Sequence, residues 1–169
     1  RAYILAQLKG AEEPISARAL AEQTNVSRQV IVQDISLLKA REEPILATAQ
    51  GYVYVRTQIN RRPRRVIVCK HTPEQSREEL NIIVDHGATV LDVSVDHPLY
   101  GEITASLHIK SRKDVEHFIH QVKEKNASLL SELTEGVHLH TIEADTEQQL
   151  QDACKALEKA NFLLTTEED

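Results

Sequence analysis

Two short segments near the start of the chain carry the same N-terminal helix-capping pattern, an apolar residue followed by a serine. Ser16 and Ser27 each follow a β-branched apolar residue and precede a stretch with helical spacing of apolar residues, over 17–23 and 28–40. A serine in this position caps a helix by accepting a backbone hydrogen bond, and the apolar residue before it packs on the helix as a staple. Because only a short turn at Thr24-Asn25 separates the segments, the pattern predicts a helix-turn-helix.

The flanking segments extend this prediction to a winged helix-turn-helix. A helical pattern over 3–8 precedes the pair and stops at Lys9-Gly10. Two strand-like runs, 45–48 and 52–55, follow the pair and are separated by Gln50-Gly51, which is a hairpin-turn signal. We therefore place a winged helix-turn-helix domain at residues 1–62.

The third helix of this domain carries the candidate DNA-reading residues. Its N-terminal end, which enters the major groove in this class of domain, presents Ser27, Arg28, Gln29 and Gln33. Arginine can pair with guanine or hold a phosphate, and glutamine can read adenine. A three-helix module for protein interactions, with these side chains merely solvated, is the alternative. The predicted wing favours DNA.

Charge divides the chain in the same place. Residues 1–65 carry eleven Lys/Arg against six Asp/Glu, a balance of +5, whereas residues 66–169 carry nine against twenty, a balance of −11. A basic half followed by an acidic half indicates that only the first half meets a polyanion, here double-stranded DNA.

The sequence indicates a cytoplasmic protein with no membrane segment. No apolar run reaches the roughly 18 residues that a membrane helix needs, and we find no signal peptide. The two cysteines, Cys69 and Cys154, lie in unrelated settings, which fits a reducing compartment. Since the first residue is Arg1 and not Met, we expect the natural N-terminus to lie further upstream.

Strands and helices alternate beyond a basic, proline-containing joint at 61–65, which either touches DNA phosphates or is solvated. Their order, β-α-β-β-α-β-α, predicts an α+β domain over 63–169 with an antiparallel sheet and helices on one face, as in a ferredoxin-like domain. We find no phosphate-binding loop, Ser-His-Asp set or kinase signature, so we predict that the chain is not an enzyme.

Histidine is the conspicuous residue of this domain, and two of the eight histidines alternate with apolar residues in the last predicted strand. Side chains two apart in a strand point to one face, so His138 and His140 converge, as is common in sites that chelate a divalent metal ion. Two solvated surface imidazoles are the alternative. His71 lies between the first predicted strand, 66–69, and the helix that follows it, and we expect that strand to lie near the last one.

A carboxylate can complete the set. Glu79 lies beside the apolar face of its predicted helix and can lean towards the sheet, whereas Glu78 should face water. A site of three histidines and one glutamate suits zinc, nickel or iron. Cys69 points to the same side as His71, and we interpret it as a small core residue.

From His71 onwards the chain resembles the three-histidine domain of bacterial regulators, and with the winged helix it resembles the niacin-responsive repressors of the NiaR type. The resemblance is carried by the segments 69–71 (CKH), 79–85 (ELNIIVD), 92–103 (DVSVDHPLYGEI), 111–115 (SRKDV) and 133–142 (LTEGVHLHTI).

The resemblance implies a homodimer that represses genes for NAD synthesis and niacin uptake, with nicotinic acid as co-repressor. It also implies one divalent transition metal ion per chain (Ni, Zn or Fe) on residues matching His71, Glu79, His138 and His140. A metal ion is the evident source of positive charge for an anionic ligand in an acidic domain. We therefore expect nicotinic acid at or beside the metal, with the loop from His97 to Tyr100 as one wall of the pocket.

Two other functions remain open at this point. In one, the chain is a metal-responsive regulator and the divalent ion itself is the signal. In the other, an open metal position activates water and the second domain is a metallohydrolase, although no general base other than Glu79 is evident.

Overall fold

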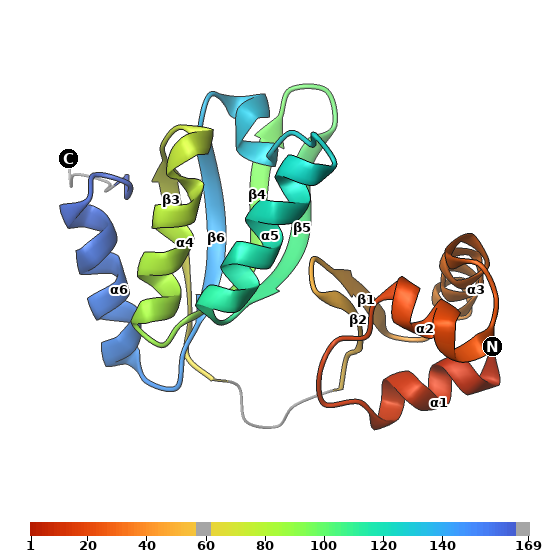
Figure 1. Ribbon diagram of the computed structural model, residues 1–169. Coiled ribbons are helices and arrows are strands. Elements are labelled where there is room, and N and C mark those ends of the chain that lie inside the picture. The colour runs from red at the N-terminus through yellow and green to blue at the C-terminus, as the bar shows by residue number, and fades with distance from the viewer. Residues whose placement is uncertain (57–61, 165–169) are drawn as a thin grey trace. The chain divides into compact units, whose positions relative to one another are not determined.

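The computed structural model describes residues 1–56 and 62–164. The chain divides into two compact units, Arg1–Ile59 and Asn60–Asp169 (Figure 1). Within the described residues, no helix combines the length and apolar character needed to cross a membrane.

The first unit is a winged helix-turn-helix. Its elements are α1 (Ala2–Gly10), α2 (Ala17–Thr24), α3 (Arg28–Ala40), β1 (Ile45–Thr48) and β2 (Gly51–Tyr54). Both predicted caps are present, since Ser16 Oγ accepts from the N–H of Ala19 at 3.0 Å and Ser27 Oγ accepts from the N–H of Val30 at 3.2 Å. The antiparallel β1–β2 hairpin is the wing.

The wing is tied to the segment before α2. The backbones of Ile15 and Tyr52 exchange two hydrogen bonds, at 3.0 and 2.8 Å. Gly51 makes this approach possible, because a Cβ built on it would lie 2.7 Å from the carbonyl carbon of Ile15. Leu20, Ile31 and Ile35 are buried in the core that the helices share.

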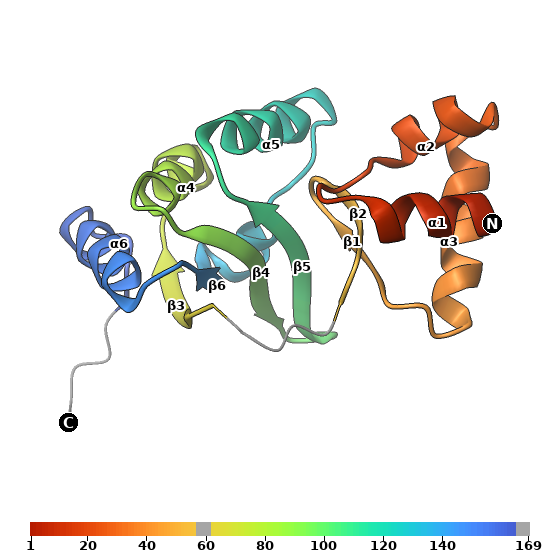
Figure 2. The same ribbon diagram turned by 90° about the horizontal axis from the view of Figure 1, so that it is seen from below.

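The second unit is an α+β domain in two layers. Its elements are β3 (Arg64–Lys70), η1 (Pro73–Gln75), α4 (Ser76–Asp85), β4 (Thr89–His97), β5 (Gly101–Ile109), α5 (Arg112–Glu124), η2 (Leu130–Thr134), β6 (Val137–Glu143) and α6 (Glu147–Lys159). Figure 2 shows α4, α5 and α6 on one face of the sheet. The core between the layers is apolar and includes Ile83, Val90, Ile109 and Leu157.

The antiparallel sheet has the strand order β3-β6-β4-β5, so the first strand pairs with the last, as expected. The α+β class and the order of elements along the chain are confirmed. The spatial order differs from that of a ferredoxin-like domain, where the first and third strands are central. Here the second and fourth strands, β4 and β6, are central, because β6 inserts between β3 and β4.

The arginines of the basic joint at 61–65 form ion pairs with acidic residues of the second unit. Arg64 Nε lies 2.7 Å and Arg62 Nη1 lies 3.2 Å from the carboxylate of Glu143, at the end of β6. Arg65 pairs more loosely with Glu147 at 3.6 Å. These three arginines remain partly exposed to solvent while they pair with carboxylates of the second unit, and Arg61 lies outside the described residues.

Candidate metal centre and ligand cavity

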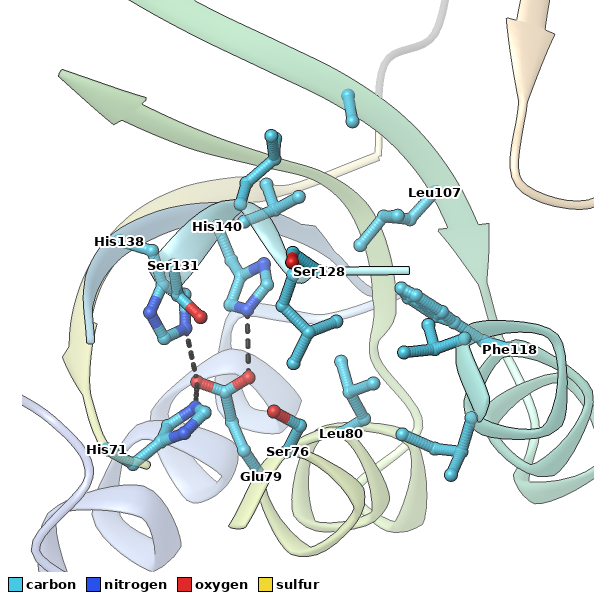
Figure 3. Close-up of a pocket in the computed structure, with 16 residues that line it drawn as sticks. His71, Ser76, Glu79, Leu80, Leu107, Phe118, Ser128, Ser131, His138 and His140 are labelled. Atoms are coloured by element: carbon cyan, nitrogen blue, oxygen red, sulfur yellow. Dashed lines mark hydrogen bonds and ion pairs between the residues drawn. The ribbon is translucent and has the colours of Figure 1, made fainter. Parts of the chain in front are cut away.

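Three imidazoles of the second unit converge on one buried carboxylate (Figure 3). The Nε2 atoms of His71 and His138 lie 2.6 and 2.8 Å from Oε2 of Glu79, and Nε2 of His140 lies 2.9 Å from Oε1. All four residues are buried. The structure thus brings together the four residues that the sequence analysis singled out as metal ligands.

Strand and helix periodicity explains this convergence. His138 and His140 alternate with half-buried residues along β6 and point towards the helices. Glu79 lies on the buried face of α4, while Glu78 is exposed, as the helical spacing predicts. His71 follows β3, which pairs with β6.

Gly136 allows the loop before β6 to pass close to His71. It has φ +94°, and a Cβ built on it would lie 2.5 Å from the carbonyl oxygen of His71. Its own carbonyl also faces His138, so one glycine borders two of the three imidazoles.

Hydrogen bonds on the far side of each ring fix the protonation pattern. The Nδ1 atoms of His71, His138 and His140 lie 2.7 to 2.8 Å from the carbonyl oxygens of Thr72, Gly136 and Asp92. A carbonyl only accepts, so each Nδ1 carries the hydrogen and donates it. In the neutral rings the three Nε2 atoms therefore direct lone pairs at the carboxylate, an arrangement that needs a cation or added protons between them.

The pKa shifts of Glu79, His71 and His140 also show that the site favours positive charge beside the carboxylate. Burial raises the pKa of Glu79, but the facing imidazoles outweigh burial and hold it well below its usual range. Burial lowers the pKa of His71 and His140, but the Glu79 carboxylate more than offsets this, so both are raised. Without a metal ion, protons supply the positive charge that the site requires.

The donors fit a transition metal ion. Neutral imidazole nitrogens whose Nδ1–H groups are held by carbonyls are typical metal ligands, and a carboxylate is a common fourth. One further donor atom lies beside this set, in a residue that is also part of the apolar core, as the sequence analysis expected. Cys69, interpreted as a core residue, is fully buried, and its Sγ together with donor atoms of Glu79 and His138 forms a group within 4.8 Å of one another. The thiol lies this close to the site because Cys69 is directly opposite His138 in the β3–β6 register.

A cavity of about 220 Å³ adjoins the four residues. Apolar side chains of the sheet and α5, such as Leu107 and Phe118, form the end away from the histidines (Figure 3). Ser76, Ser128 and Ser131 add hydroxyl groups to its lining. Part of the wall comes from the short helix η2 and the residues before it, a segment to which the sequence analysis assigned no element.

The loop predicted to wall the cavity does not do so. Neither His97 nor Tyr100 lines it, and Tyr100 is 73% exposed. The reason is that β4 continues to His97 and β5 begins at Gly101, so the connection is a tight turn beyond the cavity. There His97 Nδ1 accepts hydrogen bonds from the N–H groups of Leu99 and Tyr100.

The candidate DNA-reading residues lie at the start of α3 in the first unit. Arg28, Gln29 and Gln33 are exposed, while Ile31 and Ile35 on the opposite side are buried. Ser27 is exposed too, but its hydroxyl caps the helix. The side chains free to reach base edges are therefore those of Arg28 and the two glutamines.

Comparison with known proteins assigns both units. Residues 1–53 match the HTH domain, and residues 64–166 match the 3H domain. The chain is 50% identical over 166 residues to "Transcription repressor NadR" of Bacillus subtilis, covering 97% of this chain and 92% of that protein. It is 40% identical over 157 residues to "Probable transcription repressor NiaR" of Thermotoga maritima, covering 93% and 89%.

A winged helix-turn-helix followed by a 3H domain defines a DNA-binding transcription regulator, not an enzyme. The chain belongs to the family of NadR- and NiaR-type transcription repressors.

The raised pKa values of His71 and His140 and the lowered pKa of Glu79 set a pH window for the metal-free protein. The histidine contribution to stability is complete below the unfolded pKa of about 6.5 and is lost as pH rises through the folded-state pKa. The Glu79 contribution is complete above about 4.3 and is lost as pH falls through its lowered pKa. We expect this site to stabilise the metal-free protein most between about pH 4.3 and 6.5.

Thermal unfolding of EDTA-treated protein across this range, beside Glu79→Gln, isolates the contribution of the site. The advantage in stability of wild type over Glu79→Gln should shrink in the metal-free protein as pH rises through the raised pKa values of His71 and His140, and should persist with zinc because neutral imidazole binds metal. An advantage that grows with pH in the metal-free protein would contradict the assignment.

Proposed function

We propose that this protein represses genes for NAD synthesis and niacin uptake, with nicotinic acid as co-repressor and one divalent transition metal ion (Ni, Zn or Fe) per chain. The observation that carries the proposal is a buried set of metal donors, His71, Glu79, His138 and His140, opening onto a small, mostly apolar cavity. The resemblance to niacin-responsive repressors supplies the identity of the ligand.

Charge favours binding of the anion beside the metal. Three neutral imidazoles and the Glu79 carboxylate carry −1, so a divalent ion leaves the centre at +1 in a domain that is otherwise acidic. A cavity of about 150 Å³ holds a benzene ring, so a cavity of about 220 Å³ has room for one pyridine ring and its carboxylate. Metal and cavity together suit a small aromatic acid.

DNA recognition follows from the first unit. Arg28, Gln29 and Gln33 at the start of α3 would read bases in the major groove, and Ser27 holds the helix end that faces the DNA backbone. Helix-turn-helix dimers bind two half-sites related by symmetry. We therefore propose a cytoplasmic homodimer on a palindromic operator.

A metal-responsive regulator is the second candidate, and the buried donor set itself favours it. The two functions differ in which ligand changes DNA affinity. If DNA affinity follows nicotinic acid at constant zinc, the first is correct; if it follows zinc alone, the second is.

Metal content tests the donor set. His138→Ala removes one of three imidazoles and should weaken zinc binding by more than about 100-fold, because loss of a ligand costs more than loss of an outer partner. His120→Ala is the matched control, since His120 is exposed on α5 and pairs with Glu124. Elemental analysis after dialysis should give about one zinc per chain for the control; equal content in both variants would exclude the site.

Operator binding tests the role of α3. Arg28→Ala should cost roughly 1–3 kcal/mol of operator affinity if Arg28 pairs with a guanine, with little change on unrelated DNA. If Arg28 holds only a phosphate, affinity should fall equally on both DNAs and the salt dependence should shrink. Arg18→Ala on α2, where Arg18 pairs with exposed Glu22, is the control. Unchanged operator binding by folded Arg28→Ala would remove Arg28 from recognition.

Ligand discrimination tests the location of the co-repressor. Nicotinamide lacks the negative charge and should bind at least about tenfold more weakly than nicotinic acid, since a charge-assisted contact is worth roughly 1.5–3 kcal/mol. Calorimetry on zinc-loaded and EDTA-treated protein measures both ligands. Equal nicotinic acid affinity with and without zinc would place the ligand elsewhere, even if the protein still senses niacin.

A further inference from the structure

Cys69 is a buried donor that the three-histidine set leaves unused. It is 0% exposed, its side chain lies on the helix-covered face of β3, and it pairs in register with His138 on β6. Side chains directly opposite each other on neighbouring strands have Cβ atoms about 4.5–5.5 Å apart. The thiol is therefore held beside the imidazole of His138 by the sheet itself.

The spacing of donor atoms points to a ligand. Within the described residues, Cys69, Glu79 and His138 are the group of His, Cys, Asp or Glu donors that all lie within 4.8 Å of one another. Donors bound at about 2.0–2.3 Å to one four- or five-coordinate ion lie roughly 3–3.5 Å apart, so small side-chain shifts close the site.

A second observation is independent of the cysteine. Nε2 of His71 is buried, with its side chain 2% exposed, and has no partner with hydrogen-bond geometry although it lies 2.6 Å from Glu79. In the neutral ring this nitrogen directs a lone pair at the Glu79 carboxylate, and a cation between the two, either a proton or a metal ion, satisfies both.

We propose that Cys69 is a metal ligand of this centre and determines which ions it prefers, an inference that rests on the metal site of the proposed function. When the ion enters, the Cys69 S–H bond breaks, its proton passes to solvent, and the sulfur pair binds the metal. A thiolate favours soft or borderline ions such as zinc over iron or manganese. With the thiolate bound, the donors carry −2 and the zinc centre is neutral, so the +1 centre that attracts an anionic co-repressor arises when the co-repressor displaces the sulfur from the ion.

Zinc X-ray absorption on the full chain, without any pyridine carboxylate, tests the proposal directly. A bound cysteine adds a sulfur shell at about 2.3 Å to the nitrogen and oxygen shell at about 2.0–2.2 Å. The sequence contains no methionine, so Cys69 and Cys154 are its only sulfur atoms. Wild type and Cys154→Ser should show one sulfur per zinc, and Cys69→Ser none.

Each outcome decides the question. A shell of nitrogen and oxygen alone in wild-type protein overturns the role of Cys69 and leaves the three-histidine site standing, whereas absence of bound zinc overturns both. Loss of the sulfur shell in Cys154→Ser would also exclude Cys69. Since the wild-type spectrum needs no substitution, the test holds even if Cys69→Ser is unstable. Competition of zinc against manganese should show a preference at least about tenfold smaller in folded Cys69→Ser.

Discussion

Glu79 imposes the strictest electrostatic condition on the second unit. An ionised carboxylate taken out of water costs several kcal/mol unless compensating charges and hydrogen bonds surround it. Its partners come from three places in the chain: His71 after β3, and His138 and His140 on β6. Placing them around one helical glutamate requires β3 and β6 to be neighbours and α4 to pack on that face. The site therefore depends on the pairing of β3 with β6 and on the packing of α4 against them.

Because the buried charge of Glu79 must be compensated, the fold of this unit is more stable when a cation is bound at the site. Because carbonyls hold the Nδ1–H groups of all three rings, the neutral rings offer Glu79 only lone pairs, and protons or a metal ion must mediate their contact. Protons can fill this role in acid, and the metal ion of the proposed function would fill it at higher pH. The net charge of this centre depends on whether protons or a metal ion are bound. A small ligand in the adjoining cavity would experience that charge directly.

Local patterns were enough to predict most of the elements and the four converging residues. Caps such as Ser16 and Ser27, and the alternation around His138 and His140, act through neighbours in sequence, and so does the choice of Glu79 over Glu78. Long-range features were not predictable in this way. Insertion of β6 between β3 and β4 is decided by packing of whole strands. The turn from His97 to Tyr100 misses the cavity because the strands on either side extend further than their composition indicates.

Cys69 shows why the boundary between core residue and ligand is hard to draw from a sequence. A small thiol on an inward strand position satisfies the packing pattern, and only the register with β6 reveals its neighbour. Strand β6 also carries functional candidates at both of its ends. His138 and Glu143 are five residues apart, about 17 Å along a strand. Glu143 pairs with Arg62 and Arg64 of the joint, so the same strand carries two residues of the candidate metal centre and the ion-pair partner of the joint arginines.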